Sequence, residues 1–242
     1  MKYVKYITIL VLVCTITTGC SKSRIEKRKI TKNAITYFTE KYSIKEKNID
    51  IKNNGFYGQS AFCWNTCGEN ELDIIYNEKE YTIKYDLYND SFGDNYQYEQ
   101  IYNDLYKYLE NKFPFATKIK IDLLEEDVLY TSTKYNHDII NYMKNVISKD
   151  YFEDGYTWID IWVETKNEMQ AKEMHEKYSN IIISELENIK VSYNVAFSSE
   201  ENYGETNAFY YYHVYENNFI FKDNVDKNRK SCNRSTLVNE MC

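Results

Sequence analysis

The 242-residue chain has few of the residues on which the commonest catalytic motifs depend. It contains seven glycines and three histidines, and these glycines form no run that could cradle a phosphate. His137, His175 and His213 belong to no HExxH pattern, and no GxSxG or SxxK sets a nucleophilic serine beside a base. The sequence therefore predicts no metal site and no cofactor. It argues against the common hydrolases, and we expect each histidine to lie at the surface or at a helix start.

Proline is even scarcer, and no Pro-, Gly- or Ser-rich linker divides the chain. The single proline, Pro114, follows Phe113. Because proline removes an amide donor and restricts the preceding residue, we expect a boundary between two halves near residue 115. The predicted organisation is a signal peptide at 1–19, α+β halves at 20–115 and 116–223, and a polar, poorly ordered tail at 224–242.

A short apolar segment lies between a basic start and Cys20. Lys2 and Lys5 precede an apolar run from Ile7 to Ile16, which is too short to cross a bilayer core of about 30 Å. Small residues follow at Thr17-Thr18-Gly19. A basic start, a short apolar core and a small-residue cleavage site are the parts of an export signal. The sequence therefore predicts that the protein is exported.

The Gly19-Cys20 end of this signal resembles the lipobox of bacterial lipoproteins. The resemblance covers about the first 20 residues, departs from the family pattern at Thr17, where leucine is usual, and identifies no family for the rest of the chain. It implies that Cys20 becomes the new N-terminus and carries a diacylglyceryl group with palmitate-type chains. The expected location is the extracytoplasmic face of the cell membrane. The alternative is an ordinary secretory signal that happens to contain a cysteine.

The start of the mature chain is basic, whereas the mature chain as a whole is acidic. Loss of Lys2 and Lys5 with the signal leaves 28 basic against 37 acidic side chains, a net charge of −9, which argues against nucleic acid as a partner. Basic residues nevertheless cluster after Cys20, opposed only by Glu26: Lys22, Arg24, Lys27, Arg28, Lys29 and Lys32. They could rest on anionic headgroups, at about 1 kcal/mol per charge, or form a solvated helix face.

Hydrophobic periodicity predicts an α+β fold with a mixed, largely antiparallel sheet and packed helices. The element order of the first half resembles that of small cystatin-like modules. The resemblance implies two similar-sized halves, and the alternative is two α+β halves of another kind. Asp94 or Asn95 is the expected cap of the second helix and Asn167 that of the last, and Trp158 to Val163 should be a central strand. The expected helices cover 24–42, 98–109, 138–149 and 168–189, and the expected strands 49–51, 56–64, 72–76, 81–87, 118–124, 128–130, 158–163, 191–197, 208–215 and 219–221.

Four cysteines remain for the exported chain, namely Cys63, Cys67, Cys232 and Cys242. An even number in an oxidising compartment favours two disulfides, and three connectivities stay open. A redox pair at Cys63 and Cys67 is the less favoured reading, since three residues separate them instead of two. A four-cysteine zinc site is another alternative.

These observations favour a binding or interaction module of the cell envelope over an enzyme. Trp64, between two cysteines, is a candidate interaction residue, and a buried Trp beside a disulfide is the alternative. Partners would be the membrane through the anchor, and an envelope protein or a small ligand. The alternative function is an envelope enzyme with thiol-redox or hydrolytic chemistry. Tyr210, Tyr211 and Tyr212 suggest a binding platform only weakly, because 26 tyrosines reflect the coding bias of an AT-rich genome.

Overall fold

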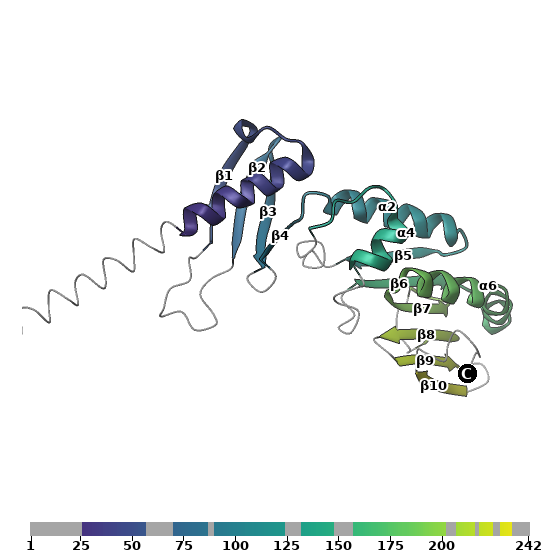
Figure 1. Ribbon diagram of the computed structural model, residues 1–242. Coiled ribbons are helices and arrows are strands. Elements are labelled where there is room, and N and C mark those ends of the chain that lie inside the picture. Colours follow the sequence, from purple (N-terminus) through teal and green to yellow (C-terminus); the bar gives the residue numbers. More distant parts are fainter. Residues whose placement is uncertain are drawn as a thin grey trace, which may run out of the picture. The chain divides into compact units, whose positions relative to one another are not determined.

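The protein is described by a computed structural model, which covers residues 26–56, 70–86, 90–123, 132–147, 157–201, 207–215, 218–224 and 228–233. It has two compact units, one of residues 1–96 with 129–134 and one of 97–128 with 135–242. Each unit has its own sheet and helices (Figure 1), which confirms the α+β class. The units divide after Tyr96, so Phe113-Pro114 lies within the second unit. The boundary expected near residue 115 was proposed to separate two α+β halves of the chain. That boundary stays a prediction.

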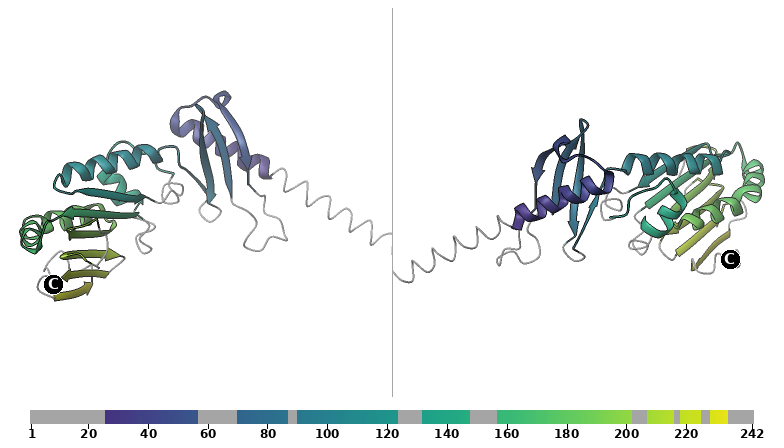
Figure 2. Two further views of the ribbon diagram at one scale, coloured as in Figure 1. Left: turned by 180° about the vertical axis from the view of Figure 1, so that it is seen from behind. Right: turned by 45° about the horizontal axis from the view of Figure 1, so that its top comes forward.

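The first unit is one helix packed on an antiparallel meander. The helix spans residues 26–42, and four strands follow in the spatial order β1-β2-β3-β4. Ala34, Ile35 and Phe38 recur at helical spacing and pack on the inward side chains of the strands. Figure 2 shows the helix lying along this sheet. The remaining elements are η1 (Glu46–Asn48), β1 (Ile49–Asn54), β2 (Glu71–Tyr76), β3 (Lys79–Asp86) and β4 (Ser91–Asp94).

The strands expected at 72–76 and 81–87 are confirmed, and they form a hairpin whose turn is shorter than the gap between those ranges. Tyr76 pairs with Lys79, so only Asn77 and Glu78 form the turn. Their φ angles are 50° and 64°, and two successive positive φ values are typical of a type I′ turn, whose twist matches that of the flanking strands. Because the register pairs Leu72 with Ile83, alternate residues of both strands face the core.

The second unit is a mixed sheet with helices on one face. The strand order is β10-β9-β8-β7-β6-β5, and only β6 and β7 are parallel among the paired strands described. Helix α6 makes the crossover between them. The elements are α2 (Tyr98–Lys112), β5 (Lys118–Leu123), α4 (Ile139–Tyr142), the π-helical turn η2 (Met143–Ile147), β6 (Thr157–Glu164), α6 (Glu168–Ile189), β7 (Ser192–Ser198), β8 (Tyr210–Tyr215), β9 (Asn218–Asp223) and β10 (Asn228–Asn233).

The main core lies between this sheet and its helices. Ile159, Ile161 and Val163 of β6 are fully buried beneath them, and β6 lies between β5 and β7, so the expectation of a central strand is confirmed. The next residues along the strand, Trp158 and Trp162, point to the opposite face because side chains alternate in a strand. That opposite face holds a smaller cluster of buried residues, Ala196, Ala208 and Tyr211.

Of the two helix caps expected from the sequence, one is confirmed and the other is wrong. Asn167 caps α6, since its side chain accepts a hydrogen bond from the Gln170 amide at 3.0 Å. Helix α2 instead begins after Gln97, which makes no side-chain cap bond. The expected caps Asp94 and Asn95 have other partners: the Asn95 side chain accepts from the Thr82 amide at 2.9 Å, and Asp94 is buried within the first unit.

Two further expectations changed. The segment after Asp223 was expected to be a poorly ordered tail, but Asn228–Asn233 forms β10, paired antiparallel with β9. The sequence of β10 is polar and lacks the hydrophobic alternation that would have predicted a strand. Its backbone nevertheless pairs with β9 and forms the edge of the sheet. Phe56 lies outside any strand, and the rest of the strand expected at 57–64, like that at 128–130, falls outside the described residues.

Candidate functional site

The site residues predicted from the sequence fall almost entirely outside the described part of the chain. Cys20, Cys63, Trp64, Cys67 and Cys242 belong to segments that the structure does not describe. Cys232 lies in β10, of which only the backbone is described, opposite Phe219. The lipid anchor, the disulfides and the role of Trp64 therefore stay predictions. Three other side-chain clusters can be built from the described residues.

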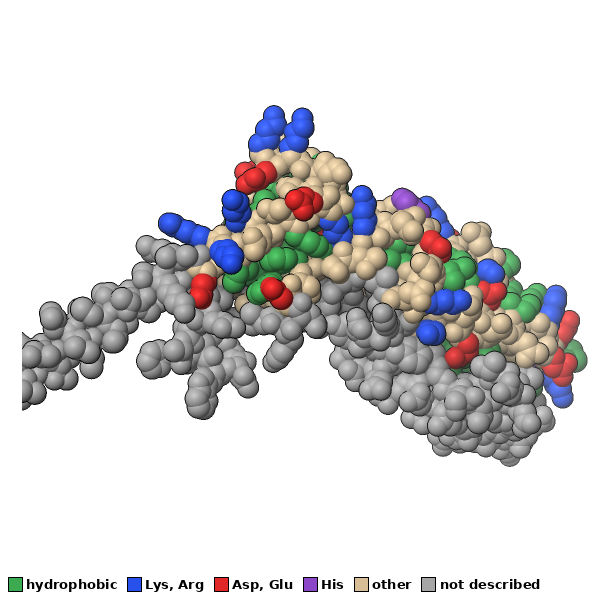
Figure 3. Space-filling view, in the orientation of Figure 1, with side chains coloured by type: hydrophobic (Ala, Val, Ile, Leu, Met, Phe, Trp, Pro, Cys, Tyr) green, Lys and Arg blue, Asp and Glu red, His purple; other side chains and the backbone are tan. Residues whose placement is uncertain are grey.

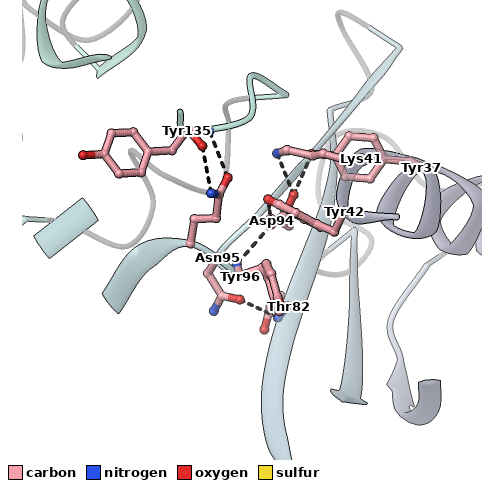
Figure 4. Close-up of polar contacts among 9 residues, drawn as sticks. Tyr37, Lys41, Tyr42, Thr82, Asp94, Asn95, Tyr96 and Tyr135 are labelled. Carbon is pink, nitrogen blue, oxygen red and sulfur yellow. Dashed lines mark hydrogen bonds and ion pairs between the residues drawn. The ribbon is translucent and has the colours of Figure 1, made fainter. Parts of the chain in front are cut away.

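The first cluster surrounds the carboxylate of Asp94 at the end of β4. Tyr37 and Tyr42 donate their hydroxyls to it, each at 2.7 Å, and the Lys41 ammonium lies at 2.8 Å (Figure 4). The Tyr96 backbone amide donates to the same group at 3.0 Å. The Asp94 side chain is completely buried, and that of Lys41 is 7% exposed. Six consecutive residues of the helix thus supply three donors to a single buried charge.

Burial and charge act in opposite directions on Lys41. Burial lowers the pKa of its ammonium, the Asp94 carboxylate offsets part of that effect, and Lys134 lowers the pKa further by repulsion. Lys134 also lies over the Tyr42 ring, 5.8 Å from its centroid. A buried ion pair is stable only when the remaining hydrogen-bonding capacity is satisfied, and here the two tyrosines satisfy it.

Aromatic rings enclose this cluster from one side. Tyr96 packs against Tyr42 and Tyr81 with centroids 4.4 Å and 4.9 Å apart, and against Phe38 at 5.3 Å. Such packing shields the ion pair from water, in keeping with the burial of both side chains. The arrangement fixes the helix to β4, so we assign the Asp94 cluster a structural role.

A separate polar pair begins α2 in the second unit. The Gln97 side chain donates to the Tyr135 carbonyl at 3.0 Å and accepts from the Tyr135 amide at 2.9 Å. Figure 4 shows the two facing bonds. The Tyr135 hydroxyl donates to Asp104 on α2 at 2.8 Å. These bonds tie the segment before α4 to α2, which compensates for the missing side-chain cap.

The second cluster lies on the sheet face opposite the helices of the second unit. Asp160 on β6 is 8% exposed, and its Oδ1 accepts from the Trp158 indole at 2.7 Å and from the Asn194 amide at 2.8 Å. Its Oδ2 accepts no hydrogen bond from any described residue. Among the described residues, the buried side-chain oxygens that lack a partner do not include Oδ2, so this oxygen is accessible to solvent.

The second cluster continues from β6 across β7 to β8. In the strand register, Asp160 lies opposite Asn194, and Asn194 lies opposite His213. The Asn194 amide oxygen accepts from the Tyr211 hydroxyl at 2.7 Å and lies 2.8 Å from His213 Nδ1. Since this oxygen only accepts, Nδ1 must carry the proton. The His213 ring also packs on Trp158, with centroids 5.4 Å apart. We call Trp158, Asp160, Asn194, Tyr211 and His213 the sheet-face cluster.

The structure corrects two of the three histidine expectations. His137 is exposed near the start of α4, as expected, with 70% of its side chain accessible. His213 is instead half-buried in the sheet-face cluster. His175, inside α6, stacks on Tyr210 and Phe221 at 4.2 Å and 5.5 Å and contacts the Tyr212 hydroxyl. Burial lowers the pKa of His175 to about 4, so this imidazole is neutral at pH 7.

The third cluster is a basic groove beside the described start of the 26–42 helix. Its volume is about 610 Å³, and three cationic side chains line it together with one carboxylate. Lys and Arg side chains gather over this end of the helix in Figure 3. The full lining is Lys27, Arg28, Thr31, Lys32, Ile35, Glu46, Ile51 and Asn54.

Within the described ranges, no three His, Cys, Asp or Glu side chains come together in a way that could hold a metal ion. In the same part of the chain, none of the helices combines the length and apolar character needed to cross a membrane. The comparisons with known proteins give no relative: no family model, no curated protein and no solved structure matches this chain.

Proposed function

We propose that this protein is a lipid-anchored binding module on the extracytoplasmic face of the cell membrane. The sequence of the first 20 residues supports the anchor. Glu26 is six residues beyond Cys20, and an extended chain advances at most about 3.5 Å per residue. The described helix would therefore begin within about 20 Å of the acyl chains, which keeps the first unit at the membrane surface.

The binding part of the proposal is supported by Oδ2 of Asp160, which is accessible to solvent and makes no hydrogen bond to a described residue. A ligand that donates a hydrogen bond to this oxygen would form a charge-assisted bond. The half-buried rings of Trp158 and His213 lie beside it and offer flat apolar contact. We infer that the sheet-face cluster binds a small polar ligand bearing hydroxyl or amine donors.

Photo-crosslinking in native membranes tests this proposal. A benzophenone side chain placed at Trp162, on the same face, should give a ligand adduct detected by the intact mass of the protein. The same group at Met169, which is 80% exposed at the start of α6, is the control position. Equal adducts at both positions would contradict a site on the sheet face.

Substitution of the carboxylate sharpens this test. Asp160→Asn removes the negative charge and replaces one accepting oxygen by a donating amide group. The amount of adduct at position 162 should therefore fall by about tenfold, because one hydrogen bond to a charged group contributes about that much to affinity. Asp50→Asn, on an exposed position of β1, is the matched control and should leave the adduct unchanged. Survival of the adduct in Asp160→Asn would refute the role of Asp160.

A further inference from the structure

The basic groove of the first unit is held open by a short chain of hydrogen bonds. The Asn54 side chain donates to the Thr31 hydroxyl at 2.7 Å, and Thr31 donates to the Lys27 carbonyl at 2.7 Å. The Lys27 ammonium lies 2.7 Å from the Asn54 carbonyl. These bonds join the helix to the end of β1 and fix one wall of the groove.

The charges along the groove favour an anionic occupant. Arg28 and Lys32 are four residues apart, so they lie on the same side of the helix, and both are exposed. Neither makes an ion pair or hydrogen bond with another described residue. Glu46 is the single carboxylate in the lining, so it can compensate the charges of Arg28 and Lys32 only in part. An arginine and a lysine so placed can together bind a phosphate.

The groove also has an apolar side that a water-soluble anion would not use. Ile51 of β1 is 50% exposed, while Ile35 beneath it is buried. Apolar surface next to cationic side chains is typical of protein surfaces that lie in the headgroup region of a bilayer, where the side chains reach both environments. The helix that carries the cationic side chains is described from Glu26, six residues after Cys20, the residue expected to carry the acyl chains.

We propose that this groove binds the phosphate headgroup of an anionic phospholipid in the membrane that holds Cys20. The proposal rests on the lipid anchor of the proposed function for its orientation, while the groove and its charges stand independently of it. Headgroup binding would hold the first unit against the bilayer at a fixed orientation and leave the second unit free for its own ligand.

Lysine footprinting on vesicles tests the groove directly. The full protein purified from membranes is reconstituted in phosphatidylcholine alone or mixed with phosphatidylglycerol, and acetylation rates are measured by mass spectrometry. Lys27 and Lys32 should react several-fold more slowly in the anionic vesicles, while Lys172 on α6 should not change. Arg28→Gln should abolish the protection of Lys27, and Lys172→Gln should leave it intact.

Three outcomes are decisive. Equal acetylation of Lys27 and Lys32 in both vesicle types would overturn the groove as a binding site. Equal protection by inorganic phosphate over neutral vesicles would overturn the headgroup in favour of a soluble phosphorylated ligand. Protection confined to phosphatidylglycerol vesicles would support the proposal.

The failure of the anchor can be distinguished from the failure of the groove. The intact mass of the N-terminus reports whether Cys20 is acylated in the same sample. If it is not, co-flotation with anionic vesicles becomes the readout. Arg28→Gln with Lys32→Gln should then reduce partitioning by roughly thirtyfold, since each charge near the surface contributes about fivefold. An unchanged partition would overturn the groove whatever the state of Cys20.

Discussion

The buried ion pair between Lys41 and Asp94 makes a quantitative prediction for stability. Asp94→Asn keeps the shape of the side chain but removes the charge that stabilises the Lys41 ammonium, which is 7% exposed. Breaking a buried ion pair by removing one partner costs about 3–5 kcal/mol. The asparagine must also replace an oxygen that accepts from Tyr37 at 2.7 Å. We expect the free energy of unfolding to fall by about 3–4 kcal/mol, a large part of the 5–15 kcal/mol typical of a domain.

Urea unfolding measures this loss, and a second variant separates charge from packing. Lys41→Met combined with Asp94→Asn removes both charges, so it should recover much of the stability, because a buried ion pair is often replaceable by neutral groups. Asp50→Asn, on an exposed position, is the matched control and should change stability by less than about 0.5 kcal/mol. The reasoning is refuted if Asp94→Asn costs no more than Asp50→Asn, or if the double variant is less stable than the single one.

Three further predictions concern stability. Burial lowers the folded pKa of His175 from 6.5 to about 4, so the unfolded chain binds more protons between these values. Stability should therefore fall as pH decreases from about 6.5 to 4, by about 1–2 kcal/mol after solvent screening; His175→Phe should lose this dependence, and an identical pH profile would contradict it. Asn167→Ala removes the α6 cap and should cost about 1 kcal/mol in urea unfolding, whereas Asn167→Ser should retain most of it. Glu78→Gly places a residue without a Cβ atom at the positive φ of 64°, so it should increase the free energy of unfolding by about 1 kcal/mol and raise the melting temperature. A lower melting temperature would argue against the type I′ turn.

Local signals in the sequence predicted the elements that depend on local chemistry. Asn167 followed by apolar residues at helical spacing marked α6 and its cap correctly, because a cap bond joins residues three apart. Hydrophobic alternation on either side of Asn77 predicted the two strands β2 and β3. The segment at β10 gave no such signal, because its pairing with β9 depends on backbone hydrogen bonds and its sequence is polar.

The clusters depend on long-range pairing, which the spacing of residues does not reveal. Asp94 was expected to cap α2, which starts close by in sequence, but the side chains that donate to it lie more than 50 residues earlier. The spacing of Tyr37, Lys41 and Tyr42 on one helix face was visible, but not the charge that they surround. Likewise, Asp160 meets Asn194 only through the parallel register of β6 and β7, which requires the α6 crossover to be known.

The attachment of the chain to the membrane is tested most directly by the intact mass of its native N-terminus. The account predicts a protein that begins at Cys20 and carries the added mass of a diacylglyceryl group. A mature chain that begins elsewhere, an unmodified Cys20, or a chain that retains residues 1–19 would contradict it.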